Sequence, residues 1–183
     1  KSKFILSKGH GCLALYALLY DKGYIKKKDL ISVGKFDSIL GGHPEHEKIN
    51  GVEVSTGALG HGLPIAVGMA IGGKLKKKHT KYFVVCGDGE INEGSVWEAL
   101  LSASKHKLDN LILLIDYNKL QSYGHVKEIL DLEPLVKKFN SFGFNTLEVN
   151  GHDVSQINNA ILRANKKKDK PSVIICHTIK GKG

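Results

Sequence analysis

The sequence predicts an α/β fold in which a mainly parallel sheet is flanked by helices on both faces. Short apolar runs that end in turn residues alternate along the chain with segments of helical periodicity. Such runs are typical of buried parallel strands, and the helices between them provide the crossover connections. The 183 residues, 42% of them hydrophobic and 25% charged, suit one globular domain with a substantial core.

The clearest βαβ unit spans residues 82–118. An apolar run at 82–86 ends in a Gly-Asp-Gly turn at 87–89, and a second run at 111–115 is followed closely by Asn118. The segment between the two runs has the periodicity of a helix, which makes the unit a strand, a crossover helix and a parallel strand.

Asp88 and Asn118 follow these two strands. Because open α/β sheets bind ligands at the carboxyl ends of their strands, we expect both side chains to face one crevice. Their carboxylate and amide oxygens suit Mg²⁺. Gly87 and Gly89 permit a tight turn and close approach of a phosphate, and a helix beginning near Ser95 would point its N-terminus at the same edge. A lone Gly-Asp-Gly turn is nevertheless weak evidence, since such residues are common where strands end.

A longer pattern is more specific. It comprises Gly-Asp-Gly-Glu-Ile-Asn-Glu-Gly at 87–94, Trp-Glu-Ala at 97–99, Asn-Leu-Ile at 110–112 and Asp-Tyr-Asn-Lys-Leu-Gln at 116–121. The pattern resembles the thiamine diphosphate motif in the form found in transketolases, and the resemblance extends over essentially the whole chain. It implies the thiamine diphosphate-binding fold, with residues 1–183 forming one diphosphate-binding domain that is truncated at both ends. The Lys-Gly-Lys-Gly ending resembles transketolases that are split into two subunits.

The resemblance also implies which residues carry the chemistry. Among the catalytic residues, His10 would approach the cofactor diphosphate, His43 would contact the ketose donor, and Glu93 would join a buried carboxylate network between subunits. The residues implied to contact thiamine diphosphate are His10, Gly57, Leu59, Gly87, Asp88, Gly89, Glu90, Asn118, Leu120, Ser122 and Lys180.

The metal would be Mg²⁺ (or Ca²⁺ or Mn²⁺), held by Asp88, Asn118 and the carbonyl of Leu120. Taken alone, a histidine such as His10 is more often a structural hydrogen-bonding residue. Only the resemblance of residues 4–24 to the transketolase stretch that brings a histidine to the cofactor diphosphate favours a role at the cofactor. His43 and His46 together are a weak metal-site signal, because no third ligand has suitable spacing.

The remaining elements are predicted from local patterns. Helices are expected at 13–20, 28–33, 65–75, 134–142 and 155–166, and further strands at 144–149 and 172–177. The helix at 65–75 carries small residues at Ala66, Gly68, Ala70 and Gly72, a pattern typical of close helix packing that often serves subunit contacts. We therefore expect self-association.

The net charge of +9 raises the question of nucleic acid. Because Arg163 is the only arginine, we expect no nucleic-acid partner, since arginine is the usual reader of guanine and phosphate. The lysine clusters at 26–28, 76–78 and 166–168 are interpreted as solvated faces. No apolar run approaches the ~20 residues that a membrane span needs, so we expect no membrane association. Three cysteines in or beside apolar runs favour reduced thiols and a cytoplasmic location.

In the resembling family, a glutamate in a separate pyrimidine-binding domain activates the cofactor, and that domain has no counterpart here. The resemblance therefore implies an N-terminal transketolase subunit that is inactive until a C-terminal subunit supplies this domain, in a two-plus-two heterotetramer. The assembly would transfer a two-carbon ketol unit from a ketose phosphate to an aldose. Two alternatives remain open: another thiamine enzyme (deoxyxylulose-phosphate synthase or a 2-oxoacid dehydrogenase component), or a non-catalytic basic domain that retains the fold.

Overall fold

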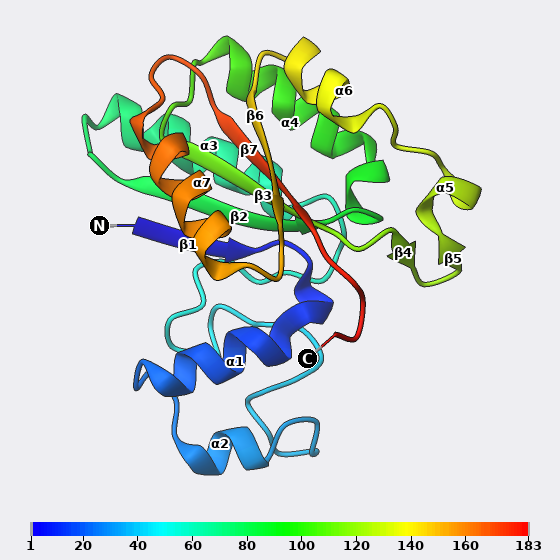
Figure 1. Cartoon of the computed structure of the whole chain (residues 1–183). Helices are drawn as coiled ribbons and strands as arrows, with labels where there is room; N and C mark the ends of the chain where they lie inside the picture. The colour runs from blue at the N-terminus through cyan, green and yellow to red at the C-terminus, as the bar shows by residue number, and fades with distance from the viewer. Residues whose placement is uncertain (1, 183) are drawn as a thin grey trace.

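The computed structural model describes residues 2–182 (Figure 1). Its strands are β1 (Ser2–Leu6), β2 (Lys81–Gly87), β3 (Leu111–Tyr117), β4 (Leu120–Gln121), β5 (Gly124–His125), β6 (Asn145–Asn150) and β7 (Ser172–His177). Its α-helices are α1 (Cys12–Asp21), α2 (Lys27–Ile31), α3 (Gly62–Leu75), α4 (Gly94–Lys105), α5 (Val126–Ile129), α6 (Leu135–Ser141) and α7 (Val154–Lys166). Single turns of 3-10 helix lie at Gly9–Gly11 and Glu90–Asn92.

Five strands form one parallel sheet in the order β1-β2-β3-β7-β6, and β4 and β5 form a separate antiparallel hairpin. The register aligns the apolar centres of the strands, with Val84 opposite Leu113 and Leu113 opposite Val173. Because the five strands run in the same direction, the segments that follow them all leave at one edge of the sheet (Figure 1). The predicted α/β architecture with a mainly parallel sheet is confirmed.

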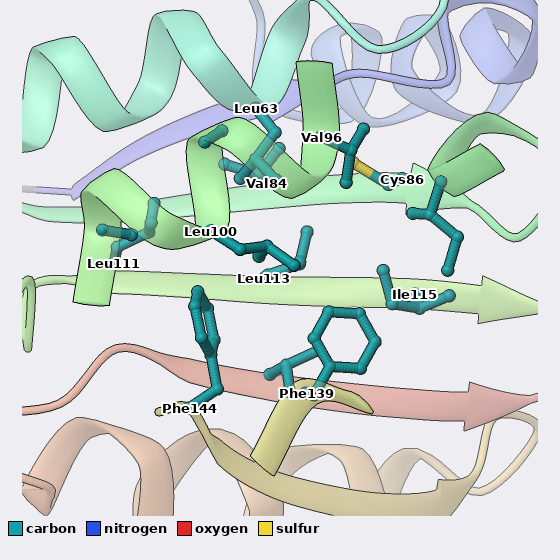
Figure 2. Close-up of a cluster of buried hydrophobic side chains, with 14 of the residues drawn as sticks. Leu63, Val84, Cys86, Val96, Leu100, Leu111, Leu113, Ile115, Phe139 and Phe144 are labelled. Atoms are coloured by element: carbon teal, nitrogen blue, oxygen red, sulfur yellow. The ribbon is translucent and has the colours of Figure 1, made fainter. Parts of the chain in front are cut away.

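Helices cover both faces of this sheet, as expected. On one face, α3, α4 and α6 contribute to the larger core, whose buried side chains include Leu63, Leu100 and Phe139 together with Val84 and Leu113 of β2 and β3 (Figure 2). On the other face, α7 packs Ala160 against a smaller cluster on the central strands. Burial of each large apolar side chain contributes roughly 1.5–3 kcal/mol, so the two clusters together stabilise the packing of the helices on the sheet.

The first two helices are organised differently. They lie beside the sheet (Figure 1) and pack with the chain that follows them into a separate apolar cluster. Its buried members are Cys12, Tyr16, Leu19, Ile25, Leu40, Ile49 and Val52. Between α2 and α3 the chain has no regular secondary structure in the described residues, so the shape of this long connection depends on side-chain contacts with α1 and the sheet.

The sequence did not predict three short elements: β1, the β4–β5 hairpin and α5. In β1 only Ile5 is buried while Phe4 is 41% exposed, so the strand lacks the continuous apolar run that marks β2 and β3. The two strands of the hairpin have two residues each, which is too short for a periodicity to be recognised. Among residues 2–182, no helix has the length and apolar character needed to cross a bilayer.

Candidate functional site

A pocket of about 1090 Å³ opens at the edge where the parallel strands end. Each of the five strands contributes a residue from the segment that follows it: Lys8 after β1, Asp88 after β2, Asn118 after β3, His152 after β6 and Thr178 after β7. The pocket is large enough for a cofactor-sized ligand. Its position agrees with the prediction that ligands bind at the carboxyl ends of the strands.

Most of the predicted site residues line this pocket. They are His10, Leu59, Gly87, Asp88, Gly89, Glu90, Glu93, Asn118, Leu120, Ser122 and Lys180. His43 and Gly57 do not line it; they contact each other beside it, where a Cβ atom at Gly57 would lie 3.0 Å from Cγ of His43. The positive φ of +151° at Gly57 and this close approach explain why a glycine stands there.

Asp88 is the most buried carboxylate of the pocket wall together with Glu90, at 2% exposure. Its oxygens accept hydrogen bonds from the backbone N–H groups of Gly89 (2.8 Å) and Lys119 (2.5 Å). Burial raises the pKa of Asp88, although these two hydrogen bonds oppose the shift. In the described part of the chain Asp88 forms no ion pair with a basic side chain. A carboxylate held without a cation in this way suits a bound metal ion.

Asn118 lies near this carboxylate, because the next residue in the chain, Lys119, donates its backbone N–H to Asp88. The Oδ1 atom of Asn118 accepts from the N–H of Leu120 (2.9 Å), and its Nδ2 donates to Asp116 (3.4 Å). Within residues 2–182, no group of three or more His, Cys, Asp or Glu side chains could hold a metal. The candidate donors are instead one carboxylate, one amide oxygen and one backbone carbonyl, a hard oxygen set that fits Mg²⁺.

A second carboxylate, Asp116, ties three segments together on the pocket floor. Lys8 forms an ion pair with Asp116, and the hydroxyl of Thr178 donates to the same carboxylate. Burial on its own raises the pKa of Asp116, but the hydrogen bonds from Lys8 and Thr178 outweigh burial and hold this pKa below its ordinary value. The pair therefore fixes the loop after β1 against the ends of β3 and β7.

His10 stands at the mouth of the pocket in a positive environment. Partial burial, followed by the charge of Lys8, lowers the pKa of His10, and His43 and Lys180 act in the same direction. Glu90 opposes the shift. Neighbouring cations that raise the cost of a further positive charge also attract anions, so this side of the pocket suits a phosphate or diphosphate group.

Glu90, which was predicted to contact the cofactor, lines the pocket, and its carboxylate makes hydrogen bonds within the protein. Both carboxylate oxygens point into the protein, where they accept from the hydroxyl of Ser7 (2.5 Å) and the N–H groups of Gly60 (3.1 Å) and Gly87 (3.1 Å). This buried carboxylate joins the end of β1, the loop before α3 and the turn after β2. Glu93, by contrast, is exposed as the residue preceding α4 and lines the pocket.

Two buried polar atoms of the pocket lining have no hydrogen-bond partner among residues 2–182: Nε2 of Gln121 and Oδ1 of Asn92. Gln121 packs closely over the turn after β2, since a Cβ atom at Gly89 would lie 2.8 Å from Cβ of Gln121. An unpaired buried donor is costly unless a ligand or water completes it. Sequence reasoning included Gln121 only as part of a motif. It did not predict that Lys8, Asp116 and Thr178 belong to the site, because these residues come together only in the folded chain.

A parallel α/β sheet with a pocket at its strand ends, a buried carboxylate that has no ion-pair partner within residues 2–182, and nearby cations is typical of domains that bind a phosphorylated cofactor. The sequence matches the family described as the thiamine diphosphate binding domain of transketolase over residues 1–183. The chain belongs to this family.

Relatives and solved structures agree with this assignment. The chain is 43% identical over 183 residues to one of the subunits of apulose-4-phosphate transketolase from Phocaeicola vulgatus, and the match covers 100% of this chain and 65% of that protein. It is 39% identical to the 6-deoxy-6-sulfo-D-fructose transketolase subunit SqwG from Clostridium sp. (strain MSTE9), covering 66% of that protein. Transketolase from Campylobacter jejuni superposes with a TM-score of 0.92 and 36% identity, over 97% of this chain and 29% of that one. The chain thus spans less than two thirds of the subunits that it resembles.

Proposed function

We propose that this chain forms the diphosphate-binding part of a transketolase N-terminal subunit. With a C-terminal partner that supplies the pyrimidine-binding domain, it would transfer a two-carbon ketol unit from a ketose phosphate to an aldose. The observation that carries the proposal is the buried Asp88 carboxylate, which has no cationic side-chain partner in the described chain and lies in the same pocket as His10 and Lys180. We place the protein in the cytoplasm, where its three free cysteines would remain reduced.

We assign roles toward the cofactor to the residues that line the pocket. Asp88, Asn118 and the carbonyl of Leu120 would hold Mg²⁺, and the metal would neutralise part of the diphosphate charge. His10 and Lys180, which line the same pocket, would approach the diphosphate, assisted by the backbone around Gly87 and Gly89, while the Glu90 carboxylate holds that turn in place. When bound, thiamine diphosphate supplies a nucleophilic thiazolium carbon.

Other residues would position the organic part of the cofactor and the sugar. We assign the aminopyrimidine contacts to Gly57 and Leu59, and packing against the thiazolium to Ser122. His43, beside the pocket, would hydrogen-bond the ketose donor. Glu93, exposed in the single chain, would be covered by another subunit, where it would join a carboxylate network.

The proposal of a partner subunit rests on the names of relatives of this chain. The chain covers 28–29% of the solved transketolases, and two relatives that match all of it bear names that designate one subunit of a transketolase. We propose that two N-terminal subunits and two partner subunits form the active assembly. The named relatives act on different sugars, so the donor should be sought among several ketose phosphates.

Reconstitution tests this function. The chain, alone and mixed with a C-terminal transketolase subunit, would be assayed with xylulose 5-phosphate and ribose 5-phosphate in the presence of thiamine diphosphate and Mg²⁺. We expect turnover only with both polypeptides, and loss of that turnover in Asp88→Asn. Strong activity of the chain alone would refute the split site, and consumption of pyruvate in place of the ketose would favour the other thiamine enzymes.

A further inference from the structure

Two side chains of α1 donate hydrogen bonds to a single irregular segment. Tyr16 is fully buried, and its hydroxyl lies 3.0 Å from the carbonyl of Gly41 and 3.0 Å from that of His43. Cys12, one helical turn earlier, has its Sγ atom 3.1 Å from the carbonyl of Gly42. Residues four positions apart share one helix face, so this face of α1 meets three consecutive carbonyl groups.

These hydrogen bonds matter because the segment has no ladder of its own. The backbone at 41–44 lies in the long connection without helix or strand, so its carbonyl groups need partners from elsewhere. Burial raises the pKa of the Tyr16 hydroxyl above its ordinary value, which keeps the group protonated and able to donate. Leu40, with no exposed surface, anchors the segment just before the hydrogen-bonded carbonyls.

The same segment is tied to the loop before α3. The carbonyl of Pro44 accepts from the N–H of Thr56 (3.2 Å), and the hydroxyl of Thr56 donates to the carbonyl of Leu6 (2.7 Å) at the end of β1. Next in the chain, Gly57 leaves space for the ring of His43. The position of His43 is therefore determined from two sides: by Tyr16 through its own carbonyl, and by the loop before α3 through its neighbour.

We propose that Tyr16 is a positioning residue for His43: its hydroxyl holds the His43 carbonyl so that the imidazole stands over Gly57, beside the pocket and facing the donor sugar. Cys12 assists by holding the preceding carbonyl. This inference rests on the proposed function, in which His43 contacts the ketose donor. It assigns an effect on the sugar alone to a residue of the separate apolar cluster around α1 and α2, which does not line the pocket.

The test compares two tyrosines of one helix. Tyr16→Phe keeps the buried ring and removes only the hydroxyl, whereas Tyr20→Phe removes a hydroxyl from a ring that is 44% exposed and that makes no hydrogen bond among the described side chains. In the assembly with the C-terminal subunit, we expect Tyr16→Phe to raise KM for xylulose 5-phosphate roughly three- to tenfold, the effect of losing one neutral hydrogen bond. The value of kcat should stay within about twofold, since ground-state and transition-state binding weaken together.

Two further measurements separate positioning from general structural damage. Calorimetry should give the same Kd for thiamine diphosphate with Mg²⁺ in both variants and the wild type. Hydrogen exchange measured by mass spectrometry should be faster in the peptide covering 41–57 of Tyr16→Phe, and unchanged in Tyr20→Phe. Faster exchange with an unchanged KM would overturn the inference, as would a KM that rises equally in both variants.

The inference and the function on which it rests fail in different ways. A wild-type assembly that binds thiamine diphosphate but turns over no ketose phosphate overturns the proposed function, and the inference with it. An active wild-type assembly whose KM and exchange rates are both untouched by Tyr16→Phe overturns the inference alone.

Discussion

Lys8 and Asp116, 108 residues apart in the sequence, form an ion pair on the floor of the pocket. Their side chains are 14% and 28% exposed, so solvent screens the pair only in part. The ammonium group of Lys8 is bound by Asp116, which also accepts a hydrogen bond from Thr178. The nearby Asp88 therefore has no ammonium partner in the described chain. The pair thus closes the floor of the pocket while keeping the candidate metal ligand free of a competing cation.

Replacing Lys8 should lower stability in a pH-dependent manner. Asp116 has a folded-state pKa below its ordinary value, so its pairing stabilises the folded chain fully above the unfolded pKa of about 3.9, and this contribution is lost as pH falls through the lower folded pKa. We expect Lys8→Met to reduce the free energy of unfolding by about 1–2 kcal/mol at pH 7, measured by urea denaturation. The difference from wild type should shrink below about pH 4.

A surface pair provides the control for this prediction. Lys48 and Glu45 form an ion pair in which both side chains are about half exposed, and such pairs contribute little. Lys48→Met should therefore change the free energy of unfolding by less than about 0.5 kcal/mol at either pH. A Lys8→Met penalty that is the same at pH 7 and at pH 3 would show that the pair with Asp116 is not its cause.

Gly9 and Gly11 lie in the same single turn, yet only one of them should resist a side chain. A Cβ atom at Gly9 would lie 2.8 Å from the backbone of Thr56 and Gly57, whereas one at Gly11 would lie 3.4 Å from Cε of the Lys8 side chain. Backbone cannot yield as a side chain does, so we expect Gly9→Ala to destabilise the fold by about 1–3 kcal/mol and to weaken thiamine diphosphate binding. Gly11→Ala should resemble wild type in thermal denaturation and calorimetry. Equal effects in the two variants would contradict the close contact.

The sequence predicted the parts of the fold whose signal is local. β2, β3 and β7 are continuous apolar runs bounded by turn residues, and each was placed within two residues of its observed ends. β1 was missed because an edge strand with one buried residue leaves no such run. The hairpin was missed because its hydrogen bonds, rather than any periodicity, define it.

The candidate site shows the same division. Asp88 and Asn118 were brought together by the argument that parallel strands end at one edge, a rule that needs no coordinates. The direction in which a side chain points cannot be predicted in this way, because it depends on which hydrogen-bond partners the fold places nearby. The carboxylate of Glu90 accepts a hydrogen bond from Ser7, and the hydroxyl of Tyr16 on α1 donates to the backbone carbonyl of His43. Neither contact leaves a trace in residue spacing.

Removing the charge of Glu90 should loosen the pocket wall. The carboxylate accepts hydrogen bonds from Ser7, Gly60 and Gly87. A glutamine side chain has only one acceptor oxygen, so its NH₂ group would face one of the backbone N–H groups. We expect Glu90→Gln to lower the free energy of unfolding by about 1–3 kcal/mol, the cost of a buried donor without an acceptor. Glu98→Gln, on the exposed face of α4, is the matched control and should be nearly neutral. Unchanged stability in Glu90→Gln would mean that these hydrogen bonds contribute little.

Asp88→Asn should separate metal-dependent from metal-independent binding. Asparagine keeps the size of the side chain but loses the charge that attracts a divalent cation, while His10 and Lys180 in the same pocket are unchanged. In wild type, calorimetry with thiamine diphosphate should give tighter binding with Mg²⁺ than with a chelator. In Asp88→Asn the Mg²⁺-dependent gain should fall by about tenfold or more, and the residual metal-free affinity should remain.

Asp37→Asn, an exposed carboxylate outside the pocket, should retain the full gain. Burial disfavours the ionised carboxylate of Asp88, and a cation that binds there would stabilise the ionised form. A Mg²⁺ effect that survives intact in Asp88→Asn would therefore place the metal elsewhere and remove the main support for the proposed function.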